Sequence, residues 1–416
     1  MSEEAQKQNR GIWTAVPPKV RLLILFQSLN GLAFGYLMIY LTAFFPEIGI
    51  SSVVVATILS LEGIVVVLAG IPFAMLSDKR GRKWFLIAGN ALFPPTILAF
   101  AVSRDVGVLY AAAALGGLAE SMGLSSWNAI IADQTGLGNR DSAFSLSFIV
   151  STSAFSLGAA LPLVFPALES AAGLGVTAVH DWTLIILGLA AFGTPLGFWT
   201  LLRNHEERHL TPAVEQVSFG GMRQTLEFSA FNSIIGFGAG LIIPLVATWL
   251  LFKFGVPDTY SGPYLALSGL TIAFSAVASP RLARKLGLFP AIVATAGSST
   301  VFMFSLAFIP NVFLVGGIYL IRAGLMNMNG PLMDSFLMGI TPPQRRGLAS
   351  MLNAVIWRLP NNASTFIGGF LLASSQFNIA ALGISHLDLP WVLATGFYVL
   401  GIVLLYARFK DVKPKG

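Results

Sequence analysis

Five ionisable residues lie inside strongly apolar stretches of the sequence, and they have the greatest potential for chemistry. They are Glu62, Glu120, Arg322, Asp334 and Arg358. A charge at the centre of a helix that crosses a bilayer costs at least about 2.5 kcal/mol unless it is paired or hydrated. Such residues therefore bind a substrate, carry a proton or form an ion pair.

Glu120 and Arg322 fall near the middle of their apolar stretches, at similar depth. In the functional interpretation, Arg322 attracts an anionic group or pairs with Glu120, and Glu120 takes up and releases a proton as its hydration changes. The alternative is a static ion pair.

Asp334 and Arg358 lie at comparable depth on consecutive stretches, which favours a structural ion pair between them. Glu62 has two interpretations. It is a candidate proton site, or it is a partner with which Arg358 forms a latch.

Uncharged polar residues in the same stretches are weaker candidates for substrate contact: Asn30, Tyr36, Asn128, Asn327 and Asn329. Each residue of this kind more often holds neighbouring helices together. Gly330-Pro331 directly follows the last two and predicts a kink there, because proline lacks a backbone N–H.

The elements that must position these residues are transmembrane helices. The sequence is 55% hydrophobic and 11% charged, whereas soluble domains carry about 25% charged residues. Helices of about 20 residues cross the hydrocarbon core. We predict twelve spans, at 19–44, 52–76, 84–102, 107–131, 143–167, 182–202, 222–251, 262–284, 288–308, 312–339, 350–375 and 389–408.

The chain repeats itself once. Gly287 lies 206 positions after Gly81, and Arg346 lies 206 positions after Arg140, each pair in loops of similar composition. This predicts an all-α membrane protein made of two pseudo-symmetric six-helix domains. The expected divisions are an N-tail at 1–18, a first domain at 19–202, a linker at 203–221, a second domain at 222–408 and a tail at 409–416.

Lys and Arg concentrate on one side of this predicted topology. Only Arg104 and Lys253 fall in the outer loops, while Arg322 and Arg358 fall within spans. Because positive residues mark the inner side, both termini are expected to be cytoplasmic. The basic inner face is expected to meet anionic lipid, not nucleic acid.

The end of the second span and the loop after it carry a motif, Ala74-Met75-Leu76-Ser77-Asp78-Lys79-Arg80-Gly81-Arg82-Lys83. It resembles the loop 2–3 motif of the major facilitator superfamily, Gly-x-Leu-Ala-Asp-Arg-x-Gly-Arg-Lys, and departs from it at Ala74, Ser77 and Lys79. Asp133 resembles the acidic residue with which that motif forms a charge cluster. The copy in the second half has Arg284 in place of the acid.

The resemblance implies two rigid six-helix domains that rock around a central cavity lined by helices one, four, seven and ten. Glu120 and Arg322 would then face the cavity from opposite domains. The residues expected to control the conformational change are Asp78, Gly81, Arg82, Asp133, Arg140, Asp334 and Arg358.

Several classes of chemistry find no support. The sequence has no cysteine, its four histidines lack metal-ligand spacing, and it has neither a Walker-type loop nor a nucleophile–base pair in any loop. We expect no metal, no cofactor and no enzymatic activity.

The resulting hypothesis is a secondary active transporter in a prokaryotic plasma membrane. It moves a small organic solute by alternating access, with protons as the default coupling ion and efflux as the leading direction. The first alternative is uptake of an organic anion recognised by Arg322, and the second is a non-transporting membrane sensor. The expected partners are the solute, protons and membrane lipid, and a monomer is expected.

Overall fold

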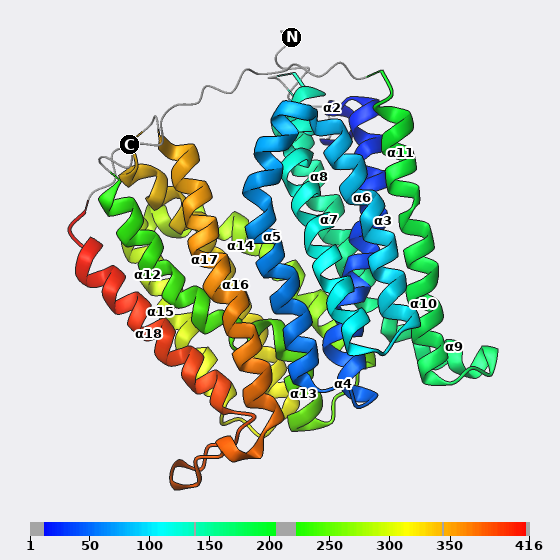
Figure 1. Cartoon of the computed structure of the whole chain (residues 1–416). Helices are drawn as coiled ribbons and strands as arrows, with labels where there is room; N and C mark the ends of the chain where they lie inside the picture. Colours follow the sequence, from blue (N-terminus) through cyan, green and yellow to red (C-terminus); the bar gives the residue numbers. More distant parts are fainter. Residues whose placement is uncertain (1–11, 137–138, 205–221, 343–344, 413–416) are drawn as a thin grey trace. The chain divides into compact units, whose positions relative to one another are not determined.

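The computed structural model describes residues 12–136, 139–204, 222–342 and 345–412 (Figure 1). The secondary structure of these residues is helical apart from one isolated β-bridge between Ile379 and Ile384. The short α2 (Ile12–Ala15) precedes the long helices, and the 3-10 turns η5 (Ser375–Phe377) and η6 (Ala380–Leu382) follow α17.

The first half contains six long segments, some of them divided by short turns. They are α3 (Pro18–Ile39) with the π-helical turn η1 (Tyr40–Phe44) and α4 (Phe45–Glu47), α5 (Ser52–Arg80), α6 (Arg82–Val102), α7 (Val106–Asp133), α8 (Arg140–Ala160) with η2 (Leu161–Val164) and α9 (Phe165–Ala172), and α10 (Val176–Ala191) with α11 (Gly193–Leu201).

The second half contains six corresponding segments. They are α12 (Arg223–Gly240) with η3 (Ile243–Leu245) and α13 (Val246–Phe254), α14 (Asp258–Leu286), α15 (Leu288–Leu306), α16 (Val312–Ile340), α17 (Arg346–Ala373) and α18 (Leu389–Phe409).

Within the described residues, ten of these twelve segments are long and apolar enough to cross a membrane. The remaining two, α14 and α17, are more polar but contain 29 and 28 residues. At 1.5 Å per residue each extends about 42 Å, which exceeds the hydrocarbon thickness of about 30 Å. The predicted fold class, an all-α membrane protein with twelve spans in two similar halves, is confirmed.

The internal repeat extends to the lengths of equivalent helices and to the glycines that follow them. Both α5 and α14 contain 29 residues, and each is followed by one glycine with positive φ before the next helix begins. Gly81 has φ 107° and Gly287 has φ 87°. Side chains rarely adopt this conformation, so glycine is required at the sharp turn between the second and third helices of each half.

The two arginines that mark the repeat also have equivalent contacts. Arg140 begins α8 and donates from Nη2 to the carbonyl of Ala132 at 3.3 Å. Arg346 begins α17 and donates from Nε to the carbonyl of Met338 at 3.1 Å. Each arginine therefore satisfies a terminal carbonyl of the preceding helix.

Glycines permit close packing at equivalent places in the two halves. A Cβ added at Gly35 in α3 would overlap the carbonyl of Phe155 in α8, and one added at Gly240 in α12 would overlap the carbonyl of Asn361 in α17. Helices in membranes approach closely where residues are small, so these positions determine how the first and fifth helices of each half pack.

The described residues fall into two compact units. Unit 1 lies within residues 1–40 and 65–214, and unit 2 lies within 41–64 and 215–416. The predicted domains, 19–202 and 222–408, differ from these units in residues 41–64. We call this segment the 41–64 hairpin. The predicted division itself stays a prediction.

Candidate functional site

Three polar contacts connect the 41–64 hairpin to other parts of unit 2. Thr248 donates to the carbonyl of Thr42 at 2.5 Å, and Ser52 donates to the carbonyl of Gly369 at 2.9 Å. The backbone N–H of Asp258 donates to Glu47 at 3.5 Å. The hairpin therefore connects to α13, α14 and α17.

The packing of α5 against α17 is close at two glycines. A Cβ added at Gly369 would overlap Ala56, and a Cβ added at Gly63 would overlap the side chain of Asn362. Glu62 is adjacent to this contact and is only 8% exposed. The structure thus places one of the predicted proton sites next to a tight helix–helix contact.

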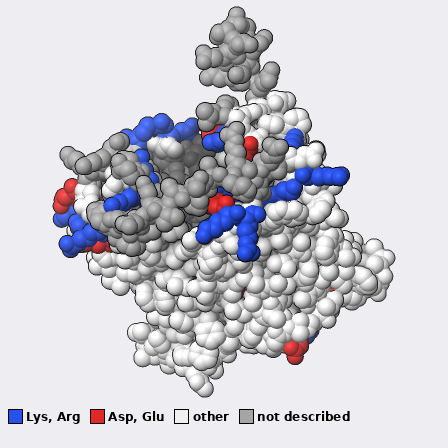
Figure 2. Space-filling view, turned by 45° about the horizontal axis from the view of Figure 1, so that its top comes forward, with Lys and Arg blue, Asp and Glu red and all other residues white. Residues whose placement is uncertain are grey.

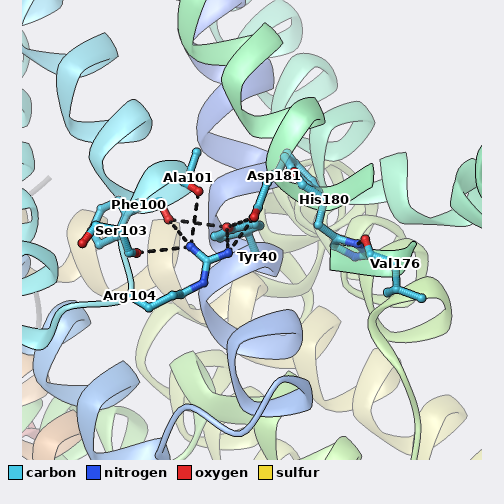
Figure 3. Close-up of polar contacts among 9 residues, drawn as sticks. Tyr40, Phe100, Ala101, Ser103, Arg104, Val176, His180 and Asp181 are labelled. Atoms are coloured by element: carbon cyan, nitrogen blue, oxygen red, sulfur yellow. Dashed lines mark hydrogen bonds and ion pairs between the residues drawn. The ribbon is translucent and has the colours of Figure 1, made fainter. Parts of the chain in front are cut away.

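A polar cluster lies at the end of helix one that precedes the hairpin (Figure 3). Asp181 of α10 accepts from the guanidinium of Arg104 at 2.6 Å and from the hydroxyl of Tyr40 at 2.5 Å, and Arg104 also donates to that hydroxyl at 2.8 Å. We call these three residues the Tyr40 cluster. They join η1, α10 and the loop between α6 and α7 within unit 1.

The other end of the guanidinium is fixed by backbone. Nη1 of Arg104 donates to the carbonyls of Phe100, Ala101 and Ser103, at 2.9, 3.3 and 3.2 Å. Tyr40 is the first residue of the π-helical turn and the last residue of unit 1 before the hairpin. The Tyr40 cluster therefore fixes the chain at the π-helical turn, an element that frequently occurs at functional sites.

Unit 2 has an equivalent ion pair. Nζ of Lys253 lies 2.5 Å from the carboxylate of Asp388 and donates to the carbonyl of Ala307 at 2.8 Å. Asp388 follows Asp181 by 207 positions, and Ala307 follows Ala101 by 206. The carboxylate and the carbonyl are therefore repeated, whereas the cation comes from the end of α13 instead of a loop.

Sequence reasoning missed both pairs. Arg104 and Lys253 were recognised only as exceptions to the charge bias, and Asp181 and Asp388 were not singled out. The predicted sixth span begins at 182 and leaves His180 outside it, but His180 lies in α10, is 1% exposed and contacts the carbonyl of Val176 at 2.8 Å. The polar residues at the start of α10 have the composition of a loop, but their side chains form hydrogen bonds with other helices and backbone carbonyls of unit 1.

The loop motif forms the charge cluster that the resemblance implied. Arg82 is 2.8 Å from Asp78 and 3.5 Å from Asp133, so one guanidinium joins the loop to the end of α7. All three side chains are partly exposed. Their role in the conformational change stays a prediction.

Arg322 lies inside unit 2, where only 4% of its surface is exposed. Its Nη2 donates to the hydroxyl of Tyr398 at 2.8 Å and lies 3.7 Å from the sulfur of Met303, while its carbonyl accepts from Ser299. These partners are uncharged and belong to α15 and α18, so in the described residues Arg322 is not paired with Glu120. Its role in binding an anionic group stays a prediction.

The remaining polar candidates on α3 are bound within unit 1. Asn30 donates to Asn90 at 2.7 Å and accepts from Thr194 at 3.1 Å. The Tyr36 hydroxyl donates to the carbonyl of His180 at 3.2 Å. These bonds connect α3 to α6, α10 and α11, which is the helix-to-helix role weighed as the alternative to substrate contact.

On the other helices, Glu120 and Asn327 are half-buried and Asn128 is exposed. Asn329 is 1% exposed and accepts from Thr295 at 3.5 Å. Asp334 and Arg358 are both exposed, and in the described part of the chain no ion pair joins them. The expected structural pair is therefore wrong, because the two side chains remain at the surface.

The architecture defines a class of protein: a membrane protein with twelve spanning helices, built as two copies of a six-helix half. The sequence matches the family model described as Major Facilitator Superfamily over residues 23–365. The chain therefore belongs to the major facilitator superfamily. This membership and the fold support a secondary transporter.

One curated relative is the uncharacterized MFS-type transporter YceJ of Bacillus subtilis (strain 168), 28% identical over 138 residues. The match covers 33% of this chain and 35% of that protein, so the chain spans about a third of the length of its curated relative.

Three solved structures share the fold at low identity. The nucleoside transporter NupG, as a D323A mutant, has a TM-score of 0.76 at 14% identity and covers 94% of this chain and 100% of its own. A bacterial homologue of the human lysosomal transporter Spinster, inward-facing and occupied, has a TM-score of 0.74 at 16% identity. The match covers 93% of this chain and 95% of that chain. An auto-inhibited POT family peptide transporter has a TM-score of 0.73 at 14% identity, and the match covers 96% of this chain and 98% of that chain.

Proposed function

We propose that this protein is a secondary active transporter that moves a small organic solute across the plasma membrane by alternating access. The observation that carries the proposal is the repeat of helix ends, in which Gly81 and Gly287 end equivalent helices of equal length. Two similar rigid halves are what a rocking mechanism requires, with a substrate site between them.

We propose protons as the coupling ion. Glu62 is a carboxylic acid that is 8% exposed at membrane depth, next to the contact between α5 and α17. The contact between α5 and α17 shapes the surroundings of Glu62, so a change of that contact would change the affinity of its carboxyl group for a proton. Glu120, half-buried on α7, is the second candidate.

Export of an amphipathic solute is our leading direction, in a topology with both termini in the cytoplasm and a monomeric protein. The Lys and Arg of the face in Figure 2 gather at one end, and the flank below them is nearly uncharged. This distribution supports the proposed orientation, since positive residues mark the inner side.

Uptake of an organic anion is the second candidate, and Arg322 is the observation that favours it. A guanidinium that is 4% exposed and bonded to Tyr398 and Met303, with no carboxylate partner in the described residues, offers charge to an anionic group. Buried charges are otherwise paired. This candidate requires access from solvent to α16.

The test begins with a thermal-shift screen of organic solutes on the purified full-length protein. Each stabilising solute is then assayed in proteoliposomes with an imposed pH gradient of either direction. We expect solute accumulation that the gradient drives and that Glu62→Gln abolishes. Solute flux that does not depend on the pH gradient would refute proton coupling. Absence of flux for every solute that binds would support a non-transporting membrane sensor.

A further inference from the structure

Two exposed tryptophans pack against each other at the end of unit 1 where α6 begins and α11 ends. Trp84 is 51% exposed and Trp199 is 52% exposed, and their ring centroids lie 5.4 Å apart with the rings nearly perpendicular. Tryptophan favours the boundary between lipid tails and headgroups, where an apolar ring can keep a polar edge near water. The pair therefore marks the depth of the membrane interface on this flank.

Lysines lie directly beside this pair. Nζ of Lys83 is 5.4 Å from the ring centroid of Trp84 and donates to the carbonyl of Arg203 at 3.1 Å, beyond the end of α11. Lys19 precedes Leu23 of α3 by about one turn, and Leu23 packs in one buried cluster with Leu86 of α6 and Phe198 of α11. Lys19 therefore lies at the same end of these helices as Lys83, whose charge disfavours a second charge at Lys19. Two lysines thus accompany two exposed indoles at this end of unit 1.

The start of α6 adds a further positive contribution. Its N-cap is Gly81, which has no side chain to accept from the first N–H groups of the helix. Uncapped N–H groups and the helix dipole favour an anion at this end. Asp78, the described acid nearest in sequence to this helix start, and Asp133 are instead joined by Arg82.

The internal repeat shows that the fold does not need these residues. In the second half, the positions equivalent to Lys83 and Trp84 are Phe289 and Pro290, which follow Gly287 as Lys83 and Trp84 follow Gly81. The same turn and the same helix start therefore form without a cation and an indole. Their presence in the first half calls for a separate explanation.

We propose that Lys19, Lys83, Trp84 and Trp199 form a binding site for the headgroup of an acidic phospholipid of the adjoining leaflet. The phosphate lies between the two ammonium groups, which relieves their mutual repulsion. The indole pair packs against the glycerol and the first methylenes of the acyl chains. Basic sites between helices at the cytoplasmic side are suited to such headgroups.

The anchoring core beneath the site is apolar and well packed. One buried cluster contains Leu86 and Ile87 of α6, Phe198 of α11 with Leu202 directly after that helix, and Leu23 of α3. This cluster fixes the helices that carry the four site residues. The site is therefore preformed, and a lipid need not order it.

The experiment titrates purified full-length protein in detergent with phosphatidylglycerol and, separately, with phosphatidylcholine, and follows the melting temperature. The test variant is Lys19→Gln/Lys83→Gln, in which glutamine keeps a hydrogen-bond donor at position 83. The matched control is Arg284→Gln/Lys285→Gln, which removes two exposed cations from the end of α14. A second test variant is Trp84→Leu/Trp199→Leu.

We expect phosphatidylglycerol to stabilise the wild type and the control equally. The lysine variant should bind it about 25-fold more weakly, at about fivefold per cation. The tryptophan variant should lose affinity severalfold while its melting temperature without lipid stays within the range of a folded protein.

Three results would overturn the proposal. The control could lose as much affinity as the lysine variant, which would indicate a diffuse basic face. Phosphatidylcholine could stabilise as well as phosphatidylglycerol, which would make the indoles general interfacial anchors. Inorganic phosphate alone could reproduce the stabilisation, which would indicate a site for a free anion.

Discussion

The two equivalent ion pairs differ in burial, and this difference predicts unequal costs for the same substitution. The side chains of Lys253 and Asp388 are 16% and 14% exposed, whereas those of Arg104 and Asp181 are 32% and 27% exposed. We predict that Asp388→Asn destabilises the protein about twice as much as Asp181→Asn.

The magnitudes follow from what each cation keeps. Removing one partner of a fully buried pair costs about 3–5 kcal/mol, and exposed pairs contribute about 0–1 kcal/mol. After Asp388→Asn, Lys253 keeps one carbonyl and the faces of Trp249 and Phe254, so we expect a loss of about 2–3 kcal/mol.

Arg104 keeps more hydrogen-bond acceptors than Lys253 when its acidic partner is removed. After Asp181→Asn its guanidinium keeps three backbone carbonyls and the hydroxyl of Tyr40. Because its acceptors are largely intact and water reaches the pair, we expect a loss of only about 1–1.5 kcal/mol.

Thermal unfolding of the purified variants in one detergent measures both losses. At about 2 °C per kcal/mol for a chain of this size, Asp388→Asn should lower the melting temperature by about 4–6 °C and Asp181→Asn by about 2–3 °C. The double variant Lys253→Met/Asp388→Asn should recover much of the loss, because no buried lysine ammonium is then left without its carboxylate. An equal or larger loss for Asp181→Asn, or a double variant no better than Asp388→Asn, would refute the reasoning.

Three further predictions concern transport. Asp78→Asn should reduce the transport rate while expression in the membrane fraction stays near the wild-type level; full activity would make the loop a topological signal only. Gly369→Ala should also slow transport, because the added methyl overlaps Ala56. An unchanged transport rate in proteoliposomes would show that the two helices can separate to accommodate the methyl group without loss of function. If an anion is the solute, Arg322→Lys should bind it more weakly because lysine lacks the planar fork. Tyr398→Phe should weaken binding about tenfold through the lost hydrogen bond to the guanidinium; normal affinity in both variants by calorimetry would remove this arginine from the site.

The helices and their repeat could be predicted because they depend on local sequence. Apolar length fixes a span, and a glycine with positive φ fixes a turn, so the predicted span 288–308 differs from the observed Leu288–Leu306 by two residues. The start of the sixth span was less accurate, at 182 against Val176. The polar pair His180-Asp181 resembled a loop because its partners lie elsewhere in the chain.

The partners of the charged residues could not be predicted from spacing. Arg322 bonds to Tyr398, 76 positions away, and Asp181 bonds to Tyr40, 141 positions away. Which face a helix turns to its neighbours depends on packing across the whole half, and a rotation of one residue, about 100°, changes every partner. The helix that carries each charged residue was therefore readable from the sequence, and side-chain direction was not.

The 41–64 hairpin has a consequence for biosynthesis. Ser52 donates to a carbonyl that follows it by 317 positions in the chain. At about 5–20 residues per second, about 15–60 s separate the synthesis of these two partners. During that interval the hairpin has left the ribosome but lacks the helices that will cover it. We expect the hairpin to remain a substrate for membrane insertion factors until α17 arrives, so that unit 2 is completed only after α17 has been made.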